Sequence, residues 1–453
     1  MYLHDSIITG IRMGFACNSS STHSIVLVPN GMELLNVPTD GDFGWDDFTL
    51  TTESEKRDYL AAMLHSNRQV ETIEEANTLT GGNIDEHAYV DHQSVFNFPL
   101  NANGSLNREF LSEYVEWIAT NPKINILGGN DNSEGHPDTA TTKALETLGG
   151  ADIAKRNGNS WVLFDPITGN RRRLNFNGDT QEKGAWPELV DLKITDACQF
   201  GCKFCYQGST PKGRVASIEE ILTAIDMCAE MGVLELAIGG GEPTNHPEFE
   251  LILSYAREKG MVPNFTTRNL SYLLENETWR TSTGAAAYSV DTKAGLMAFV
   301  KAIEATKDEW RYRNSTVVQI VVGVQSEQEL SAMLEYASAK YLRVTLLGYK
   351  TTGFGSNVTP YEYDLISVLQ KLGEEKTPEL GVDSVLAAKY GKALQEKLDV
   401  DVRCIVDREG SYSMYMDAVT GYAHRSSFEE DMSKAHSFRD LDTQALLKAF
   451  SAW

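Results

Sequence analysis

The sequence lacks the features of a membrane protein or a secreted protein. It contains no uninterrupted apolar run long enough to span a bilayer. Its first residues do not form the basic stretch and following apolar segment of a secretion signal. Both absences predict a cytoplasmic protein without a membrane partner. No internal repeat at a solenoid period is visible, and 453 residues, 42% of them hydrophobic, are enough for two or three globular domains.

Positive charge is scarce as well. The chain has 40 Lys and Arg residues against 64 Asp and Glu residues, which gives a formal net charge of −24. Affinity for nucleic acids depends largely on Lys and Arg side chains that neutralise phosphates, so this balance argues against a nucleic-acid partner. The only tight basic run, Arg171-Arg172-Arg173, is more typical of a solvated hairpin end than of a phosphate-binding groove.

Cysteine is also rare, with six residues in the whole chain. A disulfide framework would be denser and would belong to a shorter chain, so the cysteines do not indicate one. Three of them lie within eight residues and predict a metal site; these are Cys198, Cys202 and Cys205. Cys17 and Cys404 stand alone, and Cys228 falls at an apolar position of a predicted helix, where a small buried cysteine suits the core.

A regular alternation of strand-like and helix-like segments occupies the chain from about residue 187 to residue 352. Six strands that alternate with helices predict a parallel sheet with right-handed crossovers, which curls into a partial (β/α)6 barrel. In such barrels the chemistry lies at the C-terminal ends of the strands. The predicted strands are 189–195, 234–238, 262–267, 286–291, 317–324 and 342–348, and the predicted helices are 217–231, 248–259, 294–306 and 327–340.

This α/β core has an extension on each side. We expect an α+β domain for substrate or partner recognition over 1–180, the core over 181–355, and a helical and strand extension over 356–453. The first domain is predicted to contain a helix over 108–120 and a β-hairpin over 161–170. The last is predicted to contain helices over 361–372, 384–398 and 442–450, and a strand pair over 402–406 and 411–416.

The three clustered cysteines directly follow the first predicted strand of the core. Thiolates hold iron–sulfur clusters, and three of them on one short loop bind three corners of a cubane, which leaves the fourth iron without a protein ligand. Gly201 allows this loop to turn tightly. A zinc loop is the alternative, but zinc sites usually pair two CxxC units or use His, and no fourth ligand lies nearby in the sequence.

The pattern CxxxCxxC, with Phe204 before its last cysteine and a strand in front of it, resembles the radical S-adenosylmethionine (SAM) superfamily. A second element, Gly239-Gly240-Gly241-Glu242-Pro243 at the end of the second strand, resembles the GGEP motif of that family. Two motifs at the ends of consecutive strands are far more specific than a single Gly-rich turn. The resemblance covers roughly residues 187–350.

The resemblance implies a [4Fe–4S] cluster whose open iron chelates the amino and carboxylate groups of SAM. It also implies that the backbone around Gly240, Gly241, Glu242 and Pro243 holds the amino group, and that Phe204 lies near the adenine. An electron from a reductant such as flavodoxin or ferredoxin would then cleave SAM to a 5′-deoxyadenosyl radical, which abstracts hydrogen from the substrate. The cofactors carry this chemistry, while the protein orients them and excludes water.

Other strand ends supply weaker candidates. Thr267 lies at the end of the third strand. Ser289 and Asp291 end the fourth, where family members often place polar groups toward the ribose or carboxylate of SAM. Strand-end capping is the alternative role of these residues. Lys350 either reaches the substrate or lies on the surface. Cys404 either gives a hydrogen atom back to a substrate radical or is a buried strand cysteine. As the only cysteine of the C-terminal region, it does not support an auxiliary cluster.

Three functions are open at this point. The first is a radical SAM enzyme that modifies a peptide or protein, which the large flanking regions and the hairpin before the core favour. The second is a radical SAM enzyme that acts on a small metabolite or nucleotide. The third is a non-catalytic iron–sulfur electron carrier or binding module. The Gly-Gly-Glu-Pro element argues against the third, because an electron carrier has no use for a SAM site.

Overall fold

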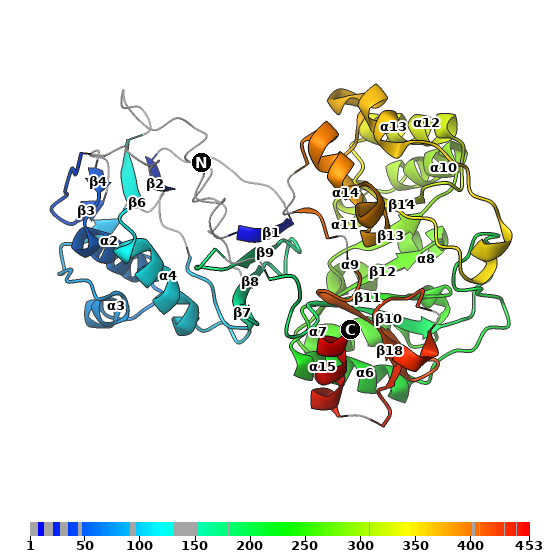
Figure 1. Cartoon of the computed structure of the whole chain (residues 1–453), viewed down its shortest axis with the longest axis horizontal. Helices are drawn as coiled ribbons and strands as arrows, with labels where there is room; N and C mark the ends of the chain where they lie inside the picture. Colours follow the sequence, from blue (N-terminus) through cyan, green and yellow to red (C-terminus); the bar gives the residue numbers. More distant parts are fainter. Residues whose placement is uncertain are drawn as a thin grey trace. The chain divides into compact units, whose positions relative to one another are not determined.

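The computed structural model divides the chain into two compact units, Met1–Gln181 and Glu182–Trp453 (Figure 1). It describes residues 8–12, 21–27, 35–43, 48–90, 97–130, 153–178, 181–307, 309–400, 404–406, 408–429, 431–440 and 442–453. Cys17 lies outside these ranges. No helix within them is both long enough and apolar enough to cross a membrane.

In the described part of the first unit, helices combine with short sheets, in agreement with the α+β expectation. Its helices are α2 (Glu53–Ser66), α3 (Ile73–Thr80) and α4 (Arg108–Thr120), and its largest sheet has the antiparallel order β1-β9-β8-β7. Helix α4 has the predicted bounds, because the Asn107 side chain accepts a hydrogen bond from the Phe110 N–H and starts the first turn. The strands are β1 (Ile8–Arg12), β2 (Ser21–Leu27), β3 (Asp42–Phe43), β4 (Phe48–Leu50), β5 (Tyr89–Val90), β6 (Ile124–Asn130), β7 (Ile153–Asn157), β8 (Ser160–Phe164) and β9 (Arg171–Leu174).

The predicted hairpin is the pair β8 and β9, which turns at Asp165. The Asp165 carbonyl accepts a hydrogen bond from the Gly169 N–H (2.8 Å), and its carboxylate accepts one from the Ile167 N–H (2.8 Å). The basic run does not form the solvated end of this hairpin. Its three arginines lie in strand β9, and Arg173 is buried at 7% exposure, because β9 is sandwiched between β1 and β8.

The second unit contains one sheet of ten strands in the order β16-β15-β14-β13-β12-β11-β10-β17-β18-β19. All pairs from β16 to β17 are parallel, whereas β17, β18 and β19 pair antiparallel, and the sheet does not close. This arrangement confirms the predicted α/β fold with a partial barrel. The strands are β10 (Leu189–Thr195), β11 (Glu235–Gly240), β12 (Val262–Thr267), β13 (Ala286–Ser289), β14 (Thr316–Val321), β15 (Val344–Leu347), β16 (Leu380–Val382), β17 (Ser413–Asp417), β18 (Tyr422–His424) and β19 (His436–Ser437).

Helices cover the outer face of this sheet (Figure 1). Helix α6 begins with the predicted capping box, in which Ser217 and Glu220 bond each other's backbone N–H. Cys228 of α6 is fully buried, and its Sγ lies 3.6 Å from the Met416 sulfur, which confirms its packing role. The helices are α6 (Ile218–Met231), α7 (Phe249–Glu258), α8 (Leu270–Glu275), α9 (Thr278–Ser282), α10 (Lys293–Glu304), α11 (Glu309–Ser315), α12 (Glu327–Ala339), α13 (Leu365–Leu372), α14 (Ser384–Leu398) and α15 (Thr443–Ala452).

Burial alternates along the parallel strands and separates two faces of the sheet. On β10, Val190, Leu192 and Ile194 are at most 1% exposed and belong to the core under the helices. Asp191 and Lys193 alternate with them, point to the opposite face and are only half-buried. We call this opposite, concave side of the sheet the inner face. On β10 its side chains are half-buried, whereas those of the outer face are buried in apolar packing.

The C-terminal segment corrects one prediction. Residues 404–406 are not in a strand, so the strand expected over 402–406 is wrong where the structure describes it. Strand β17 pairs instead with β10 and with β18, because the chain reverses after Asp417. The Asp417 carboxylate accepts hydrogen bonds from the Val419 N–H (2.9 Å) and the Thr420 N–H (3.2 Å), which builds this turn.

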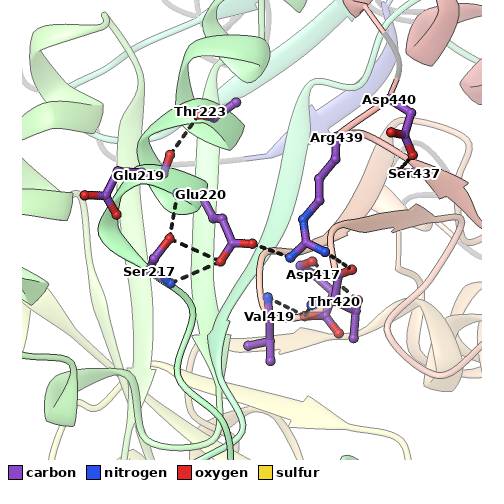
Figure 2. A network of polar contacts seen from close by, with 10 residues as sticks. All are labelled: Ser217, Glu219, Glu220, Thr223, Asp417, Val419, Thr420, Ser437, Arg439 and Asp440. Carbon is purple, nitrogen blue, oxygen red and sulfur yellow. Dashed lines mark hydrogen bonds and ion pairs between the residues drawn. The ribbon is translucent and has the colours of Figure 1, made fainter.

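A polar network attaches the β17–β18 turn to helix α6 (Figure 2). Arg439 donates one hydrogen bond to the Thr420 carbonyl (3.0 Å) and another to the Glu220 carboxylate. Thr443 of α15 bonds Glu230 of α6 in the same region. Segments expected in the C-terminal extension thus add β16 to β19 to the sheet of the core. The three-domain division stays a prediction.

Candidate functional site

The three clustered cysteines lie on the loop that leaves the C-terminal end of β10. All three side chains are half-buried. The backbone fixes the loop, because the Cys198 N–H donates to the Thr210 carbonyl (2.9 Å) and the Cys205 N–H donates to the Cys202 carbonyl (3.1 Å). Gly201, between the first two cysteines, has a φ of 65° and so makes the tight turn that the sequence indicated.

Three thiolates on one short loop match the three protein-bound corners of an iron–sulfur cubane. Zinc ligands must converge on one point, whereas the three thiolates of a cubane bind three different iron atoms. Burial raises the pKa of the Cys198 and Cys202 thiols, and the Arg268 guanidinium opposes this effect at both. Metal coordination would stabilise the thiolates further.

The Gly-rich element at the end of β11 touches the base of the cysteine loop. The Gly241 N–H donates to the Thr195 carbonyl (2.6 Å), and the Glu242 N–H donates to the Ala197 carbonyl (2.8 Å). A Cβ at Gly240, whose φ is 117°, would lie 2.3 Å from the Thr195 oxygen. One at Gly241 would lie 2.2 Å from the Ala197 oxygen. Only glycine permits this approach, so the two sequence motifs form one structural unit.

The Glu242 side chain fastens this unit to β12. Its carboxylate is 2% exposed and accepts hydrogen bonds from the Thr267 hydroxyl (2.5 Å), the Thr244 hydroxyl (2.7 Å) and the Arg268 N–H (3.1 Å). The Thr267 hydroxyl also accepts from the Asn269 N–H (2.9 Å). Both predicted cofactor-binding side chains are therefore occupied by protein partners, and Pro243 continues directly into a short 3-10 turn. The backbone of the element stays the candidate for contact with SAM.

Arg268 connects two other predicted site residues. Its guanidinium donates two hydrogen bonds to the Asp291 carboxylate, at 2.6 and 2.5 Å. The same guanidinium lies 5.6 Å from the centre of the Phe204 ring, within cation–π range. The sequence analysis gave Arg268 no role of its own, although its charge directly after a barrel strand was a usable signal. Ser289, at the end of β13, is half-buried, and its role stays a prediction.

Lys350 does not behave as a surface lysine. Its ammonium lies 4.6 Å from the Tyr206 ring and 4.9 Å from the Phe428 ring, and the residue is half-buried. The loop that follows it is bonded to the cysteine loop, since the Phe354 N–H donates to the Cys205 carbonyl (2.8 Å). Tyr206 was missed by the sequence analysis because its partners are distant in the chain.

Cys404 is exposed and lies outside any strand. The interpretation as a buried strand cysteine is therefore wrong. The predicted strand pair that suggested burial does not form there, since β17 pairs with β10 and β18. A role for Cys404 as hydrogen donor stays a prediction.

Comparison with known proteins identifies the domain that carries these motifs. Residues 192–337 match the Radical SAM superfamily. This match confirms the resemblance and the expected cofactors, a [4Fe–4S] cluster and SAM. GTP 3′,8-cyclase of Actinobacillus pleuropneumoniae serotype 3 (strain JL03) is 25% identical over 181 residues, which are 36% of this chain and 53% of that protein. PqqA peptide cyclase of Xanthomonas oryzae pv. oryzae (strain MAFF 311018) is 32% identical over 90 residues, 19% of this chain and 23% of that protein.

These matches are partial. The chain spans between about a quarter and about half of the length of the first curated relatives that it matches. Among solved structures, Streptococcus suis SuiB bound to the precursor peptide SuiA has a TM-score of 0.44 and 15% identity. That likeness covers 60% of this chain and 66% of SuiB.

Proposed function

We propose that this chain, which carries a radical SAM domain over residues 192–337, cleaves SAM reductively and uses the resulting radical to modify a peptide or protein. One observation carries the proposal. The cysteine loop after β10 and the Gly-rich element after β11 are joined by the hydrogen bonds from Gly241 to Thr195 and from Glu242 to Ala197. A cluster loop and a SAM-binding backbone segment must lie this close if one iron of the cluster is to chelate SAM.

In this proposal Cys198, Cys202 and Cys205 hold the [4Fe–4S] cluster. When bound, the cluster and SAM supply an electron and a 5′-deoxyadenosyl radical for hydrogen abstraction. The backbone from Gly240 to Pro243 binds the amino group of SAM, and Phe204 packs against the adenine. The protein orients these groups and keeps water away from them. A cytoplasmic location and a reductant such as flavodoxin or ferredoxin belong to the same proposal.

Arg268 and Asp291 complete the SAM site. The ion pair joins the ends of β12 and β13, and Arg268 also contacts Phe204. A planar guanidinium held by two hydrogen bonds to a carboxylate has little freedom, so Arg268 fixes the Phe204 ring in one orientation. We assign Arg268 the positioning of Phe204 and assign Asp291 the positioning of Arg268.

Two observations favour a peptide or protein substrate. A whole folded unit, Met1–Gln181, precedes the radical SAM domain and contains none of the clustered cysteines. One of the relatives is named a peptide cyclase. A nucleotide substrate is the second candidate, since other relatives are named GTP 3′,8-cyclase. The net charge of −24 opposes binding of a triphosphate, so the peptide hypothesis is preferred.

Anaerobic reconstitution with iron and sulfide, followed by measurement of 5′-deoxyadenosine, tests the enzyme proposal. The reconstituted protein should form 5′-deoxyadenosine from SAM when dithionite is added and not without it. Cys202→Ala should lose both the cluster absorbance and SAM cleavage. Cys228→Ala is the matched control, because it removes a thiol of the same unit that lies in the core.

Failure of a cluster-loaded protein to cleave SAM would leave an electron carrier or binding module as the better hypothesis. The substrate class needs a separate measurement. Stimulation of SAM cleavage by GTP would favour the nucleotide candidate, whereas a short precursor-peptide gene beside this one would favour the peptide candidate.

A further inference from the structure

A row of polar side chains crosses three strands on the inner face. Asp191 of β10 is in register with Tyr415 of β17, and Tyr415 is in register with His424 of β18. The rings of Tyr415 and His424 lie 6.2 Å apart, which places them on the same side of the sheet. His424 is 6% exposed and its Nδ1 has no hydrogen-bond partner. This part of the inner face therefore presents polar groups that the protein does not fully satisfy.

The neighbouring strand leaves room in front of Asp191. In β11 the residues in register with Asp191 and Lys193 are Ala237 and Gly239. A Cβ added at Gly239 would meet no atom within 4 Å, so this position faces open space. Two small residues beside a half-buried carboxylate create space for a ligand group on the inner face.

The two charged residues of β10 differ in how they are neutralised. Lys193 forms ion pairs with Asp196 (2.5 Å) and Asp417 (3.2 Å). Asp191 receives no hydrogen bond and no ion pair from any residue in the described part of the chain. An unpaired carboxylate among protein atoms is costly because it has lost hydration without gaining a partner. A cation from outside the chain that bound to this carboxylate would offset the cost.

The nearest charged groups do not neutralise the negative charge of the Asp191 carboxylate. Burial, and secondly the Glu409 carboxylate, raise the pKa of Asp191 to about 6, while Lys350 opposes them. The Lys350 ammonium is held between the Tyr206 and Phe428 rings. Glu409 accepts a hydrogen bond from Ser384 and adds a second negative charge to the same surroundings. The inner face around Asp191 is thus electronegative.

We propose that Asp191 is a specificity-determining residue that binds a cationic group of the substrate, the ammonium of a lysine or the guanidinium of an arginine in a peptide. The inference rests on the proposed function, because it places a peptide substrate on the inner face of the radical SAM domain. The open position at Gly239 provides the space, and the unpaired carboxylate provides the charge. The net charge of −24 adds a long-range attraction for basic peptides.

Affinity selection with short random peptides tests this assignment. Four pools that differ only in a central Lys, Arg, Gln or Glu are incubated with the reconstituted, SAM-bound protein, and bound peptides are quantified by mass spectrometry. The Lys and Arg pools should be enriched over the Gln pool by about tenfold, the ratio that a charge-assisted hydrogen bond supports. Asp191→Asn should remove this preference, and Asp191→Glu should keep part of it.

Glu335→Gln serves as the matched control. It also removes one negative charge, but from an exposed ion pair with Lys376 on the outer helix α12. The control should retain the full preference. Equal binding of the four pools, including no binding of any, would overturn the proposal, and so would a preference that survives Asp191→Asn. The enzyme proposal is judged separately by 5′-deoxyadenosine, since a protein that cleaves SAM but shows no charge preference refutes only the role of Asp191.

Discussion

Arg268 donates two hydrogen bonds to Asp291 across the ends of β12 and β13, at 2.6 and 2.5 Å. The pair is partly buried, with side-chain exposures of 23% and 26%. Arg268 in turn contacts the ring of Phe204, which lies between two cluster cysteines in the sequence. Through Arg268, the ends of β12 and β13 are therefore in contact with the cysteine loop.

Asp291→Asn should lower the rate of SAM cleavage by about tenfold while the cluster absorbance stays unchanged. The amide keeps the shape but removes the charge that holds Arg268, and a hydrogen bond to a charged group contributes about 1.5–3 kcal/mol. The measurement is 5′-deoxyadenosine formation at matched iron content. Glu309→Gln is the control, because its ion pair with Arg313 (2.7 Å) lies on helix α11, away from the cysteine loop. An unchanged SAM-cleavage rate in Asp291→Asn would contradict the assigned role.

Gly241→Ala should destabilise the protein by about 2–4 kcal/mol and impair cluster assembly. The added methyl would meet the Ala197 carbonyl oxygen at 2.2 Å, and backbone cannot move aside as a flexible side chain does. Gly239→Ala is the control two residues earlier, where the methyl meets nothing within 4 Å, and it should change the free energy of unfolding by less than about 1 kcal/mol. Denaturant titration gives the free energy of unfolding of both variants. An equal loss of stability in the two variants would refute the packing argument.

Asp191→Asn should stabilise the substrate-free protein by roughly 3 kcal/mol at about pH 8 and have little effect at about pH 4. The folded state raises the pKa of Asp191 from 3.8 to about 6, so its favourable contribution is complete below 3.8 and is lost as the pH rises through about 6. The variant does not lose this stability, because an Asn side chain does not ionise. Thermal unfolding of the variant and the wild type across this pH window measures their difference in stability. A variant less stable than the wild type at about pH 8 would show that Asp191 is paired.

Cys404→Ser should retain the iron content and the SAM-cleavage rate of the wild type. Cys404 is exposed and lies far along the chain from the cysteine loop, so it is not expected to hold the cluster. Iron analysis and 5′-deoxyadenosine formation without substrate are the measurements. A loss of iron in this variant would make Cys404 a cluster ligand and would contradict the assignment of three cysteines.

The sequence alone predicted the local elements well. Strands β10 and β12 and helices α4 and α14 have the predicted bounds, because the periodicity of apolar residues and the capping side chains are local signals. It also located the cysteine loop and the Gly-rich element, since both are short motifs that follow strands. The parallel sheet followed from the alternation of strands and helices.

Only the tertiary structure decided which distant residues meet. The pairing of β17 with β10, the contact of Lys350 with Tyr206 and the ion pair of Arg268 with Asp291 all join segments far apart in the sequence. Such contacts depend on how the whole chain closes its loops and fills its core, and no local pattern encodes them. The same holds for Asp191. Its charge was visible in the sequence, but its lack of a partner among the described residues depends on everything that packs around it.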